Sequence, residues 1–453
     1  MLTKIAIENF KSIGKRVELE LKPLTILVGP NASGKSSILE ALCLFVQSIW
    51  YVGYDISGNS YPSFVKYPDL KDIAHKNNLE NPISIEVHVK PSEEEKKELS
   101  EIAKRINSSN LGISIDEEIK SVGYRYSRRV VNNSIFVEQE VFCNEKEVVG
   151  VGIKRLNEAS FSPIFTFPSI LKDVVINGPI NSILNYTTFE QHIEPTGKIP
   201  RELAKPLNDF AVKIVKIIVS KLRPESSKSK VYFLSAQRGE IKPEVSTGEI
   251  YEWVGKKGEY LLYILARVSS PEYEQKKKKI EEWALKFEIK DPWAGWVGSN
   301  KAIGKFIDAE LEHPLNLAFA SFGSSQILTV ITQLFWSNEG DIILIEEPEI
   351  SIHPKGQAML PELFADAIKE GKQIIITTHS GYLPLALSRA LNKGLRAEDI
   401  AVYEVTKDKE GTKVKKKEID ERGYIKGYID SFYEVEEELA KDWAKSVKSI
   451  EEE

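Results

Sequence analysis

The segment Gly29-Pro30-Asn31-Ala32-Ser33-Gly34-Lys35-Ser36 decides the fold of this chain. It fits the pattern G-x-x-x-x-G-K-[ST], follows the apolar run LTILV (residues 24–28), and leads into the stretch SSILEALCLFVQSIW (residues 36–50), which has helical apolar periodicity. A buried strand, a glycine-rich loop and a helix in this order predict that backbone N–H groups surround a phosphate group at a helix N-terminus.

This loop predicts a nucleotide site with a magnesium ion. Lys35 is expected to bridge the β and γ phosphates of ATP, and the Ser36 hydroxyl to bind Mg²⁺. The residues expected to bind the nucleotide are Gly29, Asn31, Ala32, Ser33, Gly34, Lys35, Ser36 and Ser37. The alternative, a chance glycine-rich turn, is disfavoured because a strand and a helix flank the segment on its two sides.

A second strand ends in two acidic residues. The apolar residues 342–345 precede Glu346 and Glu347, and ligand chemistry in open α/β sheets lies at the carboxyl ends of such strands. We assign Glu346 to an outer-shell contact with Mg²⁺, behind the atoms that bind the ion directly, and Glu347 to polarising the attacking water, the roles expected for phosphoryl transfer to water. The alternative is a solvated pair of acids at a strand end.

A third apolar strand, KQIIITT (residues 372–378), ends at His379 and Ser380. Its position parallel to the strand before Glu346 favours a catalytic His379, which would donate a hydrogen bond to the γ-phosphate as charge develops. An isolated histidine at a strand end is more often structural.

Composition narrows the class of protein. The 453 residues carry 61 basic and 67 acidic side chains, a net charge of −6, which argues against a protein that coats nucleic acid with a wholly basic surface. No apolar run approaches the ~18 residues of a membrane span, and Cys43 and Cys143 cannot form a disulfide framework. We expect a soluble, cytoplasmic protein, and the bias toward Lys and Glu is typical of a thermophile.

The order of patterns predicts an α/β fold whose nucleotide-binding core is split by a large insertion. We expect a first lobe at residues 1–240 with a mixed β-sheet, a helical insertion at 241–319 with helices from Glu259 to Phe319, a second lobe with a parallel-sheet core at 320–435, and a C-terminal helix at 436–453. More than three hundred residues separate Lys35 from Glu346, too many for a compact kinase or GTPase.

Six segments together resemble the ABC-type ATPase heads of the RecF, SMC and OLD group, most closely the stand-alone OLD-like ATPases. They are IENFKSI (7–13), GPNASGKSS (29–37), ASFGSSQIL (320–328), LIEEPEISIHP (344–354), IITTHS (375–380) and ERGYIKGYIDSFY (421–433). The resemblance implies hydrolysis of ATP that is sandwiched between two heads of a homodimer or higher homo-oligomer. It also implies a serine turn that faces the nucleotide of the partner.

Several residues enter through this resemblance. Ser321, Gly323, Ser324 and Ser325 form the candidate serine turn, for which a plain helix N-cap is the alternative. Gln237 is the candidate for the glutamine that links the lobes and contacts nucleotide and Mg²⁺, although it could be a plain surface residue. Gln47 and Gln139 are weaker candidates. His353-Pro354 resembles the dimer-facing loop, or else caps a turn.

The resemblance leaves three functional classes open. The first is a DNA-associated ATPase of repair or anti-phage defence, and the second is an ATP-dependent assembly scaffold for a separate nuclease or toxin without direct DNA binding. A transporter ATPase subunit is the third. The basic segments 276–279 and 413–417 and the residues Arg125, Arg128 and Arg129 could contact DNA phosphates, or could be solvated faces.

Overall fold

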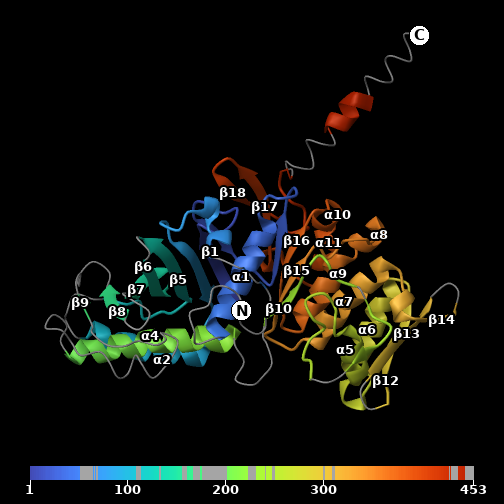
Figure 1. Cartoon of the computed structure of the whole chain (residues 1–453), viewed down its shortest axis with the longest axis horizontal. Coiled ribbons are helices and arrows are strands. Elements are labelled where there is room, and N and C mark those ends of the chain that lie inside the picture. Colours follow the sequence, from blue (N-terminus) through green and yellow to red (C-terminus); the bar gives the residue numbers. More distant parts are fainter. Residues whose placement is uncertain are drawn as a thin grey trace, which may run out of the picture. The chain divides into compact units, whose positions relative to one another are not determined.

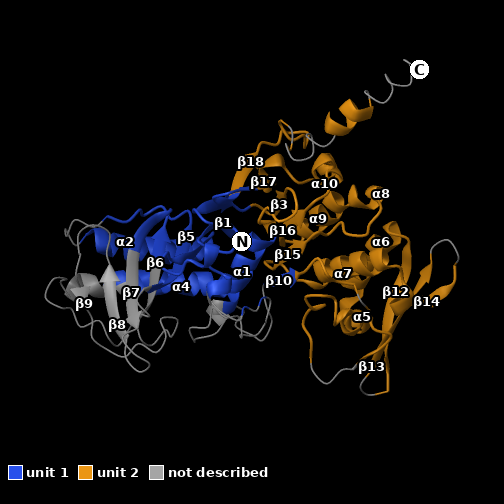
Figure 2. Cartoon of the chain, turned by 45° about the horizontal axis from the view of Figure 1, so that its top comes forward, with its two compact units in different colours: residues 1–21, 36–233, 407–412 blue, residues 22–35, 234–406, 413–453 orange. Residues whose placement is uncertain are grey.

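The computed structural model describes residues 1–50, 65, 67, 70–108, 114–131, 134–155, 161–166, 174–175, 201–222, 231–239, 241–246, 250–298, 301–308, 312–427, 429 and 437–443. It divides into two compact units, coloured separately in Figure 2. Unit 1 comprises residues 1–21, 36–233 and 407–412, and unit 2 comprises residues 22–35, 234–406 and 413–453. The expected C-terminal helix falls mostly outside the described residues, of which 437–443 are helical.

Unit 1 is built on an antiparallel sheet with the strand order β2-β1-β4-β5-β6-β7-β8-β9. Its strands are β1 (Leu2–Glu8), β2 (Val17–Glu20), β4 (Ile83–Val89), β5 (Val122–Val131), β6 (Ser134–Cys143), β7 (Lys146–Arg155), β8 (Phe161–Thr166) and β9 (Val174–Val175). The β-sheet expected in the first lobe is therefore present, and the described pairings within it are antiparallel.

Three helices accompany this sheet: α1 (Lys35–Trp50), α2 (Glu93–Asn107) and α4 (Arg201–Leu222). Helix α2 begins at a capping box, because the Glu95 N–H donates to Ser92 Oγ and the Ser92 N–H donates to the Glu95 carboxylate. Figure 1 shows α4 lying along α2, and α4 also contacts strands β4 to β7. The apolar side chains of α4, such as Phe210 and Ile214, are fully buried by this packing.

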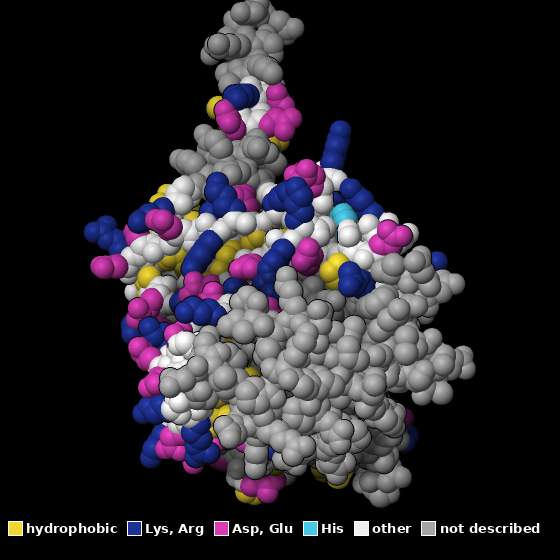
Figure 3. All heavy atoms as spheres, turned by 90° about the vertical axis from the view of Figure 1, so that its left-hand side faces the viewer, with side chains coloured by type: hydrophobic (Ala, Val, Ile, Leu, Met, Phe, Trp, Pro, Cys, Tyr) yellow, Lys and Arg dark blue, Asp and Glu magenta, His cyan; other side chains and the backbone are white. Residues whose placement is uncertain are grey.

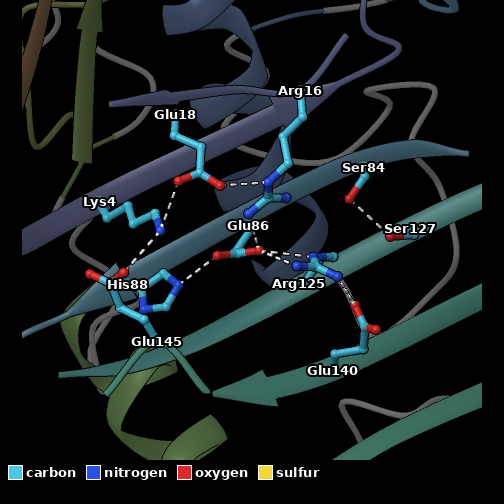
Figure 4. A network of polar contacts seen from close by, with 10 residues as sticks. All are labelled: Lys4, Arg16, Glu18, Ser84, Glu86, His88, Arg125, Ser127, Glu140 and Glu145. Atoms are coloured by element: carbon cyan, nitrogen blue, oxygen red, sulfur yellow. Dashed lines mark hydrogen bonds and ion pairs between the residues drawn. The ribbon is translucent and has the colours of Figure 1, made fainter. Parts of the chain in front are cut away.

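One face of the sheet carries a buried carboxylate, that of Glu86 on β4 (Figure 4). Glu86 accepts hydrogen bonds from Arg16 at 2.7 Å and from Arg125 at 2.8 Å, and His88 Nε2 lies 2.7 Å from its other oxygen. Burial alone raises the pKa of Glu86, but His88, Arg16 and Arg125 together hold it far below its usual range. The network therefore stabilises the sheet only while Glu86 is ionised.

We predict that Glu86→Gln lowers the free energy of unfolding at pH 7 by about 3 kcal/mol, because it leaves buried cations without their carboxylate. A depressed native pKa gives stability that is present above the unfolded pKa and is lost as the pH falls below it. Urea denaturation should therefore show a steeper loss of stability below about pH 4.5 in the wild type than in the variant.

The control for this prediction is Glu18→Gln on the same face, since Glu18 is half exposed and its ion pairs with Lys4 and Arg16 are solvated. It should change stability by less than about 1 kcal/mol. Equal stability of Glu86→Gln and wild type at pH 7 would contradict the role given to the network.

The predicted parallel-sheet core has the strand order β10-β15-β16-β3-β17-β18, and most of its residues belong to unit 2. The strands are β3 (Leu24–Val28), β10 (Val231–Leu234), β15 (Ile342–Glu346), β16 (Gln373–Thr378), β17 (Ile400–Asp408) and β18 (Gly411–Lys417). Strands β15, β16, β3 and β17 are mutually parallel neighbours. Their residues are almost entirely buried, as the continuous apolar runs predicted. The fold class expected from the sequence is therefore confirmed.

Helices of unit 2 follow the strands of this core. They are α7 (Phe322–Trp336), α8 (Pro354–Gln357), α9 (Leu360–Lys369), α10 (Tyr382–Leu385) and α11 (Leu387–Asn392). Helix α7 is buried from Ser325 to Trp336, so it is an internal helix rather than a surface one. In the described part of the chain, no helix has the length and apolar character needed to cross a membrane.

The expectation that helices fill residues 259–319 is wrong from residue 289 onward. Helices α5 (Leu261–Val268) and α6 (Glu274–Lys286) are followed by β12 (Ile289–Val297), β13 (Lys301–Asp308) and β14 (Pro314–Asn316), which form a small sheet with β11 (Val245–Ser246). The missed signal is period-two alternation in KAIGKFID, where Ala302, Gly304 and Phe306 are buried between more exposed neighbours.

Candidate active site

Three parallel strands end at the same edge of the core sheet. Val28 at the end of β3 pairs with Thr378 of β16, and Glu346 at the end of β15 pairs with Thr377. The residues that follow these strands are the glycine loop, Glu347 and His379. Parallel pairing in this register therefore brings the glycine loop to Glu347 and His379, which lie more than three hundred residues further along the chain.

The glycine loop is packed tightly against β17. A Cβ atom at Gly29 would lie 2.1 Å from the carbonyl oxygen of Val405, and the Gly29 φ angle is 155°. Only glycine avoids this collision. The pairing of β3 with β17 thus fixes where the loop leaves the sheet.

Lys35 points back into its own loop. Its Nζ donates hydrogen bonds to the carbonyl oxygens of Gly29 and Pro30, each at 2.8 Å, and lies 3.4 Å from His379 Nδ1. Burial lowers the pKa of Lys35 to about 8, while the charges of Glu347 and Glu349 act in the opposite direction. The ammonium group is therefore desolvated yet mainly charged at pH 7, which suits it to an anionic ligand.

The remaining loop residues differ in exposure. Asn31, Ala32 and Ser36 are exposed, whereas Ser33 and Ser37 are buried. The Ser37 hydroxyl lies 3.1 Å from that of Ser12, within unit 1. The exposed Ser36 is the hydroxyl of this segment with access to a ligand, as its predicted role requires.

Glu347 and His379 form the centre of the site. The Glu347 carboxylate lies 3.0 Å from His379 Nε2, and this interaction lowers the pKa of Glu347 despite partial burial. The backbone of Glu347 is left-handed, with φ 44°. This conformation costs about 1 kcal/mol for a residue with a side chain and persists only where neighbouring contacts impose it.

Glu346 contacts the segment that contains Gln237, through the residue before it. The Glu346 carboxylate accepts a hydrogen bond from the Ala236 N–H at 3.3 Å, and Gln237 is the next residue, with an exposed side chain. Gln47 is fully buried and exchanges two hydrogen bonds with the Val65 backbone, so it has a structural role. The side chain of Gln139 lies outside the described residues.

Two residues of this site were missed by sequence reasoning. Arg238 is buried and donates to the backbone carbonyl oxygens of Glu346 at 2.6 Å and Glu347 at 2.8 Å. Glu349 is also buried and accepts hydrogen bonds from Thr378 Oγ1 and the His379 N–H. Arg238 holds the end of β15, whereas Glu349 holds the end of β16.

The serine turn begins helix α7. Ser321 is its N-cap and accepts a hydrogen bond from the Ser324 N–H at 3.1 Å, so the N-cap reading of the sequence describes the local geometry. Ser321 is exposed and Ser324 half-buried, while Ser325 is buried. Two of the three candidate serines are therefore accessible to a ligand.

The turn also contacts the loop that follows Glu347. A Cβ atom at Gly323 would lie 2.3 Å from the carbonyl oxygen of Ser351, so the backbones touch directly. His353, further along that loop, accepts from the Lys355 N–H at 3.2 Å and caps α8. This is the structural alternative that the sequence left open for His353.

Comparison with known proteins agrees with this geometry. Residues 1–383 match the family AAA_15, described as an AAA ATPase domain. The chain belongs to this family. The match spans most of the chain and includes the glycine loop, the acidic strand end and His379.

Other similarities of this AAA ATPase domain are more remote. Over 50 residues it is 40% identical to an OLD nuclease of Thermus scotoductus, a match that spans 11% of the chain and 9% of the nuclease. Its structure aligns with the SMC head domain of Thermotoga maritima at 12% identity and TM-score 0.42, over 92% of this chain and 99% of the other. It also aligns with an Smc head domain from Pyrococcus furiosus, solved with the C-terminal domain of ScpA, at 13% identity and TM-score 0.45. This alignment covers 97% of this chain and 99% of the other.

We predict that Gly29→Ala disrupts the glycine loop of the AAA ATPase domain, because its new Cβ would overlap Val405. The variant should lose at least about 3 kcal/mol of unfolding free energy or fail to bind nucleotide, since close-packed backbone must shift to accommodate it. Isothermal titration and urea denaturation measure both quantities.

Gly340→Ala is the matched control. Gly340 also has positive φ, at 83°, but a Cβ atom there would meet nothing within 4 Å. Its free energy of unfolding should fall by only about 1 kcal/mol, the cost of an alanine in the left-handed conformation, and its affinity for nucleotide should not change. Equal effects of the two substitutions would refute the packing argument.

Proposed function

We propose that this AAA ATPase domain hydrolyses ATP to ADP and phosphate through nucleotide-dependent pairing of two copies. One observation carries the proposal: Lys35, His379 and Glu347 form a continuous chain of contacts at the mouth of the glycine loop. A cation for phosphates and an ionised carboxylate for water, joined by a histidine, are the groups that phosphoryl transfer to water needs.

The residues present fit a magnesium ion that binds together with ATP. In the described part of the chain, no cluster of three acidic, histidine or cysteine side chains forms a metal site of its own. Mg²⁺ typically takes one or two protein oxygens and completes its shell with water and phosphate oxygens. Ser36 and Glu346 would hold it, with Gln237 beside them, and the bound ion would offset phosphate charge.

Each residue of the chain then has a separate task. Glu347, ionised because its pKa is lowered, accepts the proton of the attacking water. Lys35 stabilises negative charge on the β and γ phosphates, and His379 keeps Glu347 in place through Nε2. Its Nδ1, 3.4 Å from Lys35 Nζ, is then the nitrogen that turns to the γ-phosphate when Lys35 binds ATP. The backbone amides of the loop orient the phosphates.

The serine turn supports the proposed pairing. In the described residues, the hydroxyls of Ser321 and Ser324 make hydrogen bonds within the turn and none to the glycine loop of the same chain. They stand at the N-terminus of the 15-residue helix α7, where an anion is favoured. We therefore assign them to the γ-phosphate of ATP held by a second copy.

We predict that Glu347→Gln reduces the ATP hydrolysis rate at least about 100-fold, because the general base is lost. Nucleotide binding should persist, since Lys35 and the loop are unchanged, and ATP should accumulate in a dimer visible by light scattering. Glu339→Gln, an exposed substitution at the opposite end of β15, is the control and should match the wild type. Wild-type turnover in Glu347→Gln would rule out the base assignment.

The biological role is a separate proposal, for which the charged surface is informative. The lysines of 276–279 contact backbone carbonyls or acids of their own helix, Arg125 pairs with Glu86 and Glu140, and Lys417 is buried against Glu404. On the face shown in Figure 3, basic and acidic side chains are interspersed over the described residues. These contacts favour paired or solvated faces for Lys276 to Lys279, Arg125 and Lys417.

This pairing favours the second candidate role, an ATP-dependent assembly scaffold for a separate nuclease or toxin, over a DNA-associated ATPase of repair or defence. We predict that duplex, single-stranded and ended DNA each change the ATPase rate less than about twofold at low salt, where phosphate contacts are strongest. Stimulation of tenfold or more that disappears as salt rises would favour the DNA-associated role instead.

A further inference from the structure

Arg238 has no task in the mechanism above, yet it is the largest fully buried charged side chain in the described residues. Its guanidinium group donates to three carbonyl oxygens: Nη1 to Ser235 at 2.9 Å and to Glu346 at 2.6 Å, and Nη2 to Glu347 at 2.8 Å. All three acceptors belong to the backbone, so no carboxylate is used up by these bonds.

The two acid residues present their carbonyl groups to one side chain. In a continuous strand, consecutive carbonyl groups point to opposite sides, so one planar group cannot bind both. Here the backbone at Glu347 is left-handed, which turns its carbonyl toward the group that also binds Glu346 O. The fork of Arg238 matches two acceptors held in this way, a geometry that a lysine ammonium does not reproduce.

The same residue is fixed from its other side. The Glu347 N–H donates to the carbonyl oxygen of Thr377 at 2.9 Å, in the neighbouring strand. Glu347 is therefore held by β16 through its N–H and by Arg238 through the carbonyls on both sides of its α-carbon. Strand β15 ends here, and the Glu347 side chain leaves the strand alternation and lies beside His379.

Arg238 is also a buried positive charge near the carboxylates of Glu346, Glu347 and Glu349. Burial lowers the pKa of Arg238 to about 10, while Glu349, Glu346 and Glu347 act in the opposite direction, so the group stays charged at pH 7. None of the described ion pairs joins it directly to a carboxylate. Of the two Glu347 oxygens, Oε1 lies beside His379 Nε2, and Arg238 occupies neither of them.

We infer that Arg238 is a positioning residue for the reaction: it holds the backbone of Glu347 in the left-handed conformation that aims the carboxylate at the attacking water. This inference rests on the proposed function. The next residue, Gly239, approaches the backbone of Gln326 in α7 so closely that a Cβ atom would lie 2.8 Å from Gln326 N. Arg238 is thus anchored beside the helix that begins with the serine turn.

The test replaces Arg238 by Lys, which keeps the charge but cannot bind both carbonyls. We expect kcat for ATP to fall at least tenfold, while the Kd for ATP with Mg²⁺ and ATP-dependent dimerisation stay within threefold of wild type. Arg238→Gln, which removes the charge and the guanidinium fork, should lower kcat further while the Kd for ATP again stays within threefold of wild type. Both variants are assayed at a temperature where circular dichroism shows native helix content.

Arg267→Lys is the matched control. Arg267 also donates to a backbone carbonyl, that of Tyr251 at 3.1 Å, and lies over the ring of Trp336. Its contacts among the described residues include none with the site. It should leave kcat unchanged. Wild-type kcat in Arg238→Lys, or a parallel loss of kcat, ATP affinity and thermal stability in both Arg238 variants, would overturn the inference.

The outcomes separate this inference from the proposed function. If the wild-type protein does not hydrolyse ATP, or if Glu347→Gln hydrolyses it normally, the proposed function or its base assignment fails. If wild type is active, Glu347→Gln is inactive and the folded Arg238 variants turn over at the wild-type rate, only the positioning role of Arg238 fails. If Arg238→Lys does not fold, the same comparison of kcat with the Kd for ATP in Arg238→Gln tests the positioning role.

Discussion

The parallel pairing of β3 with β16, and of β16 with β15, is the constraint on which the site depends. It places the end of each strand at one edge, so that the glycine loop, Glu347 and His379 meet although the chain between them builds a separate antiparallel sheet. The strands are buried along their whole length, so a slip in register would expose apolar residues and separate the polar ends at the same time. Fold and site are thus specified by the same contacts.

At that edge the protein arranges several charged groups in little space. Lys35 is desolvated and donates to loop carbonyl groups, and Glu347 is ionised beside His379. Arg238 binds the end of β15 and Glu349 binds the end of β16. Such groups act strongly on a bound phosphate because they are already oriented and partly removed from water. The left-handed backbone of Glu347 is the local strain that this arrangement sustains.

How much the sequence could predict differs between the parts of the site. The sequence predicted the glycine loop, the acidic strand end and His379, because each directly follows an apolar run and parallel strands that end in polar residues imply a shared edge. It did not predict Arg238, because the partners of Arg238 are backbone carbonyl groups that come together only in the fold. Gln47 illustrates the converse: it was a candidate by residue type, but the structure buries it against Val65.

The secondary structure could be predicted from the sequence where apolar and polar residues alternate regularly. The prediction was less successful where it relied on amino-acid composition. Strands β12 and β13 contain glycine, isoleucine and, in β12, proline, which disfavour a helix, but the segment was taken as helical from its Trp and Lys content. The serine turn is a mixed case: its cap geometry follows from Ser321 and Ser324, whereas the ligand that it faces depends on a second chain. The proposed site is therefore complete only when two copies of the chain are paired.

Mixing two inactive variants tests this claim most directly. Lys35→Ala removes the phosphate contact of one chain, and Ser321→Ala combined with Ser324→Ala removes the turn of the other; a mixed dimer would retain one intact composite site. With random pairing the mixture should recover about a quarter of wild-type ATP hydrolysis, while each variant alone stays inactive. No recovery, in a mixture shown to form mixed dimers, would contradict a site shared between two copies.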